Sequence, residues 1–198
     1  MQINLLGVLM IKMEIKTERL VLREWKEKDK EDLVENINNV NITKNLLKVP
    51  HPYTEKDADW WINKCAEKQK EKPREGYEFA IELKDEENAG GGICLSGIDE
   101  FQNIAELGYW LGEKYWRQGI MSEAVEAILD FGFNELKLRK IFMHAYVENE
   151  GSNKIAKKFK FKLEGTRIKH VKDKATGTIH NDNVYGLLKQ DWRAENGD

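Results

Sequence analysis

The chain has 198 residues, of which 40% are hydrophobic and 34% are charged, and its formal net charge is −3. Domains commonly run to about 100–200 residues, so this length fits one domain better than two. The nearly balanced charge excludes the strongly basic surface that is typical of nucleic-acid-binding proteins. We therefore expect a single globular domain that binds no nucleic acid.

Cysteine and histidine usage argues against a disulfide framework and against a metal site. Cys65 and Cys94 form no C-x-x-C motif, and the four histidines show no metal-ligand spacing. We predict reduced thiols, no bound metal and a cytoplasmic location. The apolar run over 3–11 is too short to span a bilayer and has no basic flank or cleavage site. Residues 1–12 are interpreted as an N-terminal extension outside the core, and 13–194 as the single domain, with no membrane segment.

The first third of the chain predicts one strand and two helical segments. The strand is expected over 14–24, and a helical segment over 27–47, which the prolines at 50 and 52 end. Thr54 and Asp57 have the spacing of a capping box, which predicts a second helix over 54–70.

The remainder of the chain predicts strands that alternate with helices. Strands over 77–83 and 92–99 are separated by the polar turn 85–88. The later elements are expected at 104–111 (strand), 120–136 (helix), 140–147 (strand), 152–159 (helix), 161–171 (strand) and 178–188 (strand). This order predicts an α/β fold, in which helices flank a mixed sheet.

The turn before the helix over 120–136 is the most informative local feature. Apolar residues recur in that helix with a period near 3.6, which indicates a face that packs against a core. Gly119 permits a positive φ or the close approach of a ligand, and Ser122 can cap the helix or donate to a phosphate oxygen. Unpaired N–H groups at a helix start favour a pyrophosphate-bearing cofactor. Taken alone, the pattern also describes an ordinary turn and cap.

The stretch AELGYWLGEKYWRQGIMSEAVEAIL resembles the acetyl-CoA-binding region of the GNAT N-acetyltransferases, in particular the ribosomal-protein N-terminal (RimJ/RimL-like) branch. Three further segments resemble family landmarks in the same order: TERLVLREW the first strand, ENEGSNKIAKKFKFKLEG the Asn-x-x-Ser helix and NDNVYGLLKQDW the last strand. The resemblance spans about 13–193. It implies a mostly antiparallel central sheet, in which a splayed pair of strands holds acetyl-CoA.

The resemblance also implies the cofactor contacts. Backbone groups of Tyr109, Trp110 and Leu111 would pair with the pantetheine arm, and one of their N–H groups would polarise the thioester carbonyl. Asn149 and Ser152 match the Asn-x-x-Ser motif and would lie beside the pantetheine and the sulfur, although either residue can simply cap the next helix. The pyrophosphate would be held by N–H groups of Arg117, Gln118, Gly119, Ile120, Met121 and Ser122.

Glu106 is the candidate base, since an amine must lose a proton to attack a thioester. It lies on the strand beside the cofactor, and the alternative is a solvated or ion-paired carboxylate. The tyrosine with which many relatives protonate the departing thiolate would fall at Ala156, so that acid is Ser152, water or absent. Two further departures are Met121, which replaces a small residue, and Lys160, which replaces a glycine.

The resemblance implies an acetyl-CoA-dependent N-acetyltransferase that uses direct transfer to a primary amine. A protein N-terminus is the first expected acceptor, and a polyamine or aminoglycoside is the second. The rival interpretation is a non-catalytic acyl-CoA-binding module. In the family the segment before the central strands lines the acceptor groove, so Tyr53 and Trp60 are candidates for acceptor contact, although the tryptophans at 60 and 61 are most simply core and rim residues. Dimers are common in the family, and the sequence alone does not decide whether this chain forms a homodimer.

Overall fold

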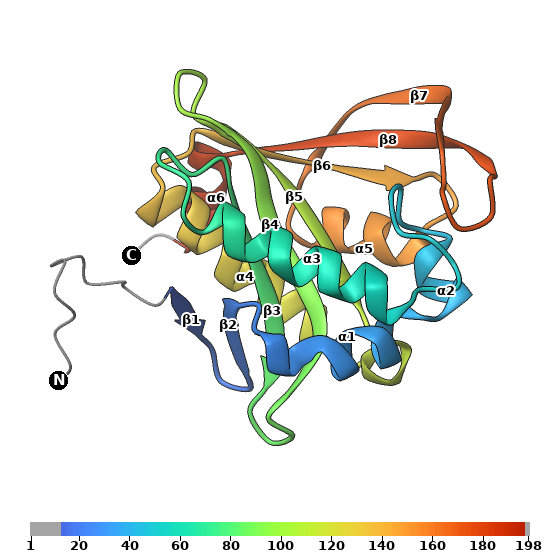
Figure 1. The fold of residues 1–198 in the computed structure, drawn as a ribbon. Coiled ribbons are helices and arrows are strands. Elements are labelled where there is room, and N and C mark those ends of the chain that lie inside the picture. Colours follow the sequence, from blue (N-terminus) through green and yellow to red (C-terminus); the bar gives the residue numbers. More distant parts are fainter. Residues whose placement is uncertain (1–12, 197–198) are drawn as a thin grey trace, which may run out of the picture.

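The computed structural model describes residues 13–196, so the predicted extension over 1–12 lies outside the described residues. Its centre is one eight-stranded sheet with the order β1-β2-β3-β4-β5-β6-β8-β7 (Figure 1). Neighbouring strands are antiparallel except for β5 and β6, which confirms the predicted mixed, mostly antiparallel sheet. The strands are β1 (Glu14–Lys16), β2 (Leu20–Glu24), β3 (Gly76–Leu83), β4 (Asn88–Asp99), β5 (Ile104–Leu111), β6 (Lys140–Tyr146), β7 (Lys162–Lys172) and β8 (Ile179–Leu188).

Helices cover both faces of the sheet, each over its own hydrophobic core (Figure 1). One core lies under α1 (Lys30–Ile37), α2 (Val40–Thr43) and α3 (Glu55–Lys68). The larger core lies under α4 (Ile120–Asp130), α5 (Glu150–Lys158) and α6 (Lys189–Asn196). Within residues 13–196 no helix has both the length and the apolar character that crossing a bilayer requires.

The predicted single strand over 14–24 is wrong, because the chain turns back over 17–19 and forms the β1–β2 hairpin. Thr17 N–H donates to the Leu20 carbonyl at 3.0 Å, which closes the turn. Thr17 and Arg19 also donate to Glu123 on α4, a contact that draws the turn towards that helix. A partner so far along the chain leaves no mark on the local sequence pattern.

The predicted helical segment over 27–47 is interrupted. A 3₁₀ turn over Glu27–Asp29 precedes α1, and α2 begins separately because the Asn39 side chain accepts a hydrogen bond from Asn41 N–H at 2.9 Å. The prediction over 54–70 is confirmed by α3, whose Thr54–Asp57 capping box is present. The helix predicted over 120–136 becomes α4 followed by a π-helical turn over Phe131–Glu135, and α6 was not predicted.

β4 starts earlier than predicted, at Asn88, because the glycine run over 90–92 belongs to the strand and not to the preceding turn. A Cβ at Gly90 would lie 2.6 Å from the Tyr115 ring, and one at Gly91 would lie 2.6 Å from the Trp110 carbonyl oxygen. Glycine therefore allows β4 to lie close to its neighbour β5 and to Tyr115, which follows β5 in the chain.

Candidate functional site

The two central strands separate halfway along their length. β5 and β6 pair in parallel only at Ile104–Glu106, opposite Lys140–Phe142. Beyond that point β5 continues to Leu111 and β6 continues to Tyr146, but the two strands no longer pair with each other and they diverge (Figure 1). This gap is the splayed strand pair expected from the sequence, and it leaves one edge of β5 without a neighbouring strand.

The register with β4 decides which groups line that edge. Gly112 N–H donates to the Gly90 carbonyl at 2.8 Å, and hydrogen-bonded pairs alternate along an antiparallel ladder. The backbone of Trp110 therefore faces β4, whereas the N–H groups of Tyr109 and Leu111 face the gap. The Leu111 carbonyl on the same edge accepts a hydrogen bond from the Trp116 indole at 2.8 Å. Of the three residues predicted to pair with pantetheine, Tyr109 and Leu111 therefore direct their N–H groups into the gap, whereas Trp110 does not.

β5 leads into a turn with two left-handed residues, Arg117 at φ 60° and Gly119 at φ 79°. The first helical hydrogen bond of α4 runs from Glu123 N–H to the Gly119 carbonyl at 3.0 Å. The N–H groups over 120–122 precede it and have no acceptor inside the helix. Met121, which replaces a small residue, packs its side chain against the core. The turn therefore presents backbone donors at a positive helix end, an arrangement suited to a phosphate.

The Tyr109 hydroxyl of β5 lies near the side chain of Ser152, which comes from the first turn of α5. The Tyr109 hydroxyl oxygen is buried and makes no hydrogen bond in the part of the chain that the structure describes. Burial raises the pKa of Tyr109 to about 12, and the nearby Ser152 side chain offsets part of that effect. The family resemblance implied only a backbone contact for Tyr109, and the structure adds that its ring packs against the larger core. An orphaned hydroxyl at this place fits a polar ligand in the gap.

Asn149 is the N-cap of α5, and its side chain accepts a hydrogen bond from Ser152 N–H at 3.2 Å. The Asn-x-x-Ser motif therefore places Ser152 in the first turn of a helix that starts beside the end of β6. Lys160, which replaces the family's glycine, adopts φ 55°. A lysine thus keeps the left-handed geometry at that turn.

Glu106 lies on β5 at the last residue that pairs with β6, opposite Ser96 of β4 and Phe142 of β6. Its side chain points to the sheet face of Gly108 and Trp110, the face that α1 and α3 cover. It is half-buried, and its carboxylate has no hydrogen bond or ion pair in the described part of the chain. The alternative that Glu106 is ion-paired therefore has no support among the described residues. Its carboxylate is free to accept a proton at the point where the gap opens.

The two candidate acceptor contacts lie in different environments. Tyr53 is buried in the core under α1 and α3, with 7% of its surface exposed. Trp60 is 61% exposed on α3, where the Lys64 ammonium lies 4.6 Å from its ring centre. Trp60 therefore takes the place of a rim residue, whereas the neighbouring Trp61 packs against the same core as Tyr53.

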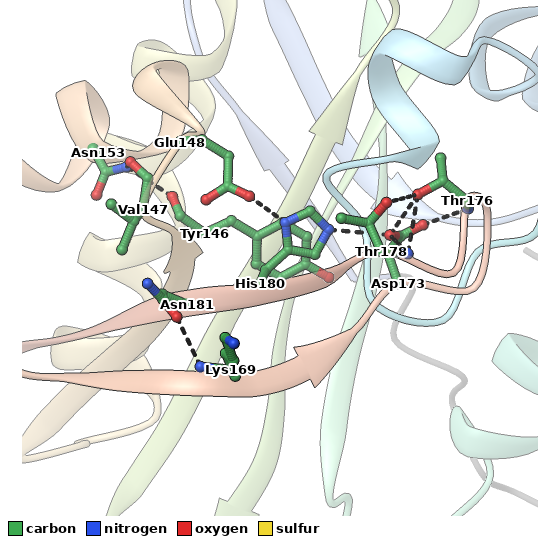
Figure 2. A network of polar contacts seen from close by, with 10 residues as sticks. All are labelled: Tyr146, Val147, Glu148, Asn153, Lys169, Asp173, Thr176, Thr178, His180 and Asn181. Carbon is green, nitrogen blue, oxygen red and sulfur yellow. Dashed lines mark hydrogen bonds and ion pairs between the residues drawn. The ribbon is translucent and has the colours of Figure 1, made fainter.

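A polar network closes the far end of β6 (Figure 2). His180 on β8 lies between the carboxylates of Glu148 and Asp173, and the Tyr146 ring stacks on it with centroids 4.2 Å apart.

Asp173 also accepts hydrogen bonds from the loop between β7 and β8, at Thr176 and Thr178. In that loop Lys174 N–H donates to the Leu47 carbonyl beyond α2 at 3.2 Å. The network therefore joins the end of β6 to the loop beyond α2, and sequence reasoning missed it because its members are distant in the chain.

We expect this network to stabilise the protein most between about pH 4.5 and 6.5. Burial alone would lower the pKa of His180, but the hydrogen bonds that the protonated ring donates to Glu148 and Asp173 raise it above its ordinary value of 6.5. This contribution is complete below about pH 6.5 and is lost as pH rises through the folded value. The pKa of Glu148 is lowered from 4.5, and that of Asp173 is lowered to about 2, so their contribution is lost only as pH falls further.

The measurement is the difference in melting temperature between wild type and His180→Gln from about pH 4 to pH 9. The difference should be largest in that window and should shrink on its alkaline side. His51→Gln, which changes an exposed histidine, is the control. A difference that is constant across the range would show that ionisation of His180 contributes nothing.

A family model described as "Acetyltransferase (GNAT) domain" matches residues 19–162, which include β5, the turn and α4. The "Uncharacterized N-acetyltransferase YoaA" of Bacillus subtilis (strain 168) is 27% identical over 175 residues, which cover 88% of this chain and 96% of that protein. The "Ribosomal-protein-serine acetyltransferase" of Escherichia coli (strain K12) is 33% identical over 90 residues, which cover 46% of this chain and 50% of that protein. A crystal structure of a GNAT-family acetyltransferase from Bacillus anthracis has a TM-score of 0.76 and 26% identity, and the match covers 90% of this chain and 99% of that one.

Proposed function

Since the chain belongs to the GNAT acetyltransferase family, as its sequence predicted, we propose that it transfers acetyl from acetyl-CoA directly to the α-amino group of a protein N-terminus. The observation that carries the proposal is the free edge of β5, which leads straight into the left-handed turn before α4. Both lie inside the segment that the family model matches.

The choice of acceptor is supported by one relative and by proton chemistry. The relative from Escherichia coli, which is 33% identical over 90 residues, is named for a ribosomal protein. An α-amino group titrates near 8 and a lysine near 10.4, so the former needs only a modest base. A half-buried carboxylate without an ion-pair partner, such as that of Glu106, meets this need.

Acetyl-CoA would supply the acetyl group as an activated thioester. The N–H groups of Tyr109 and Leu111 would bind the pantetheine arm as a neighbouring strand would, and one of them would donate to the carbonyl oxygen. The N–H groups of the turn would bind the pyrophosphate, as proposed for Arg117, Gln118, Gly119, Ile120, Met121 and Ser122. Trp110 would contribute to this binding indirectly, because its backbone pairs with β4 and so fixes the position of the β5 edge that faces the gap.

Two groups on opposite faces of the sheet would move the protons. Glu106, on the face of α1 and α3, would accept a proton from the incoming ammonium. The Ser152 hydroxyl, with the Tyr109 hydroxyl beside it, would return a proton to the departing thiolate. Tyr109 of β5 would thus take the role of the tyrosine that many relatives carry at the position of Ala156.

We expect Ser152→Ala combined with Tyr109→Phe to lower the turnover number about 100-fold, the range of a lost general acid. Each single change should cost less, because the other hydroxyl remains. Affinity for coenzyme A should change less than about threefold, since the backbone donors are untouched. Tyr77→Phe, on β3, is the control. Wild-type turnover in the double variant would remove both hydroxyls from the mechanism.

The experiment that tests the function is calorimetric titration with acetyl-CoA, run beside thiol release against N-terminal peptides and polyamines. Binding with release from the peptides supports the proposal. Release from polyamines alone would reassign the acceptor, and binding without release would indicate a non-catalytic binding module. Absence of binding would contradict the proposed site.

A further inference from the structure

The β1–β2 hairpin contacts the turn before α4, although the two are far apart in the sequence. Arg19 of the hairpin makes three hydrogen bonds there. Its Nε donates to the Glu123 carboxylate at 2.7 Å, its backbone N–H donates to the same carboxylate at 2.8 Å, and its Nη1 donates to the Gln118 carbonyl at 2.9 Å. The Thr17 hydroxyl also donates to Glu123.

The bond to Gln118 sets the orientation of the turn. A peptide unit whose carbonyl is held by a guanidinium cannot rotate freely, and the neighbouring N–H groups are fixed with it. The guanidinium lies against the turn itself, since its Nη2 is 3.4 Å from the place that a Cβ on Gly119 would occupy. Arg19 thus fixes the backbone in the orientation that leaves the donors over 120–122 free.

The hydrogen bonds from Arg19 to Glu123 bring a positive charge next to that carboxylate. This carboxylate lies in the first turn of α4, close to the N–H groups that would receive a pyrophosphate. Burial raises the pKa of Glu123, but hydrogen bonds from Thr17 and Arg19 outweigh it and lower the pKa, so the group is ionised. Without Arg19, an unpaired negative charge would repel a phosphate at that helix end and compete for the same donors.

We propose that Arg19 is a positioning residue of the pyrophosphate site, which holds the Gln118 peptide and neutralises Glu123 so that the turn accepts an anion. The inference rests on the proposed function, because it assumes that coenzyme A binds at this turn. Arg19 acts through these two neighbours and needs no contact with the cofactor.

The test is a mutant cycle on coenzyme A affinity, measured by calorimetric titration of the full chain. Arg19→Ala should weaken binding roughly tenfold or more, the effect of one lost charge-assisted hydrogen bond and one uncompensated charge. Glu123→Gln alone should change affinity little. Adding Glu123→Gln to Arg19→Ala should restore much of the loss, because the repelling charge is gone. The loss should also shrink at high salt, which screens exposed charges.

Arg139→Ala is the matched control, since Arg139 is also exposed and its Nε donates to a carbonyl, that of Gln102, at the opposite end of β5. Melting temperatures of all variants separate a loss of folding from a loss of binding. If Glu123→Gln fails to restore affinity in the Arg19→Ala background, or if Arg19→Ala binds normally, the inference is wrong. If the wild type itself does not bind coenzyme A, it is the proposed function that fails.

Discussion

Glu106→Gln should lower the turnover number by about 100- to 10,000-fold, the range attributed to a general base. The substitution keeps the size of the side chain and removes its capacity to accept a proton from the acceptor ammonium. Affinity for coenzyme A should stay within about twofold of wild type, because Glu106 lies on the sheet face opposite to that of Tyr109 and makes no hydrogen bond within residues 13–196 that the change would break.

Steady-state kinetics with an N-terminal peptide, together with calorimetric titration of coenzyme A, would measure the two quantities separately. Glu164→Gln is the control, because it changes a strand glutamate that is exposed and paired with Lys140. Turnover unchanged by Glu106→Gln would mean that Glu106 is a solvated strand carboxylate, and that the acceptor loses its proton to water.

Gly119→Val should weaken coenzyme A binding roughly 100-fold while the fold is retained. Gly119 has φ 79°, a conformation that costs a residue with a Cβ about 1–2 kcal/mol and a β-branched residue more. The turn would relieve that strain by rotating, which would displace the N–H groups over 120–122 and lose hydrogen bonds to the pyrophosphate. The site of the new Cβ contacts only the exposed Arg19 side chain, at 3.4 Å, so the core is not disturbed.

Two further variants make this prediction specific. Gly119→Asn should bind more tightly than Gly119→Val, because asparagine tolerates the left-handed region. Gly177→Val places the same strain at φ 73° in the β7–β8 turn and should leave binding unchanged. Tight binding by Gly119→Val would show that the left-handed turn is not needed for the cofactor.

Local elements were predictable where one segment carries its own signal. The Thr54–Asp57 capping box predicted the start of α3, and the apolar period after Gly119 predicted α4. The boundaries that were wrong depend on distant partners. Thr17 and Arg19 bend the chain towards Glu123, and Gly90 lies close to the Tyr115 ring, contacts that no window of the sequence contains.

The sequence by itself determined the family, the α/β order of elements and the residues of the turn, because the motif from Ala105 to Leu129 is continuous in the chain. Only the tertiary structure decided which edge of β5 is free, that Tyr109 lies near Ser152, and that Arg19 donates to the Gln118 carbonyl in the turn. The side chains of a strand alternate with period two whichever strand lies beside it, so their pattern does not show which amides remain unpaired. That depends on the register with β4 and on the point at which β6 leaves β5.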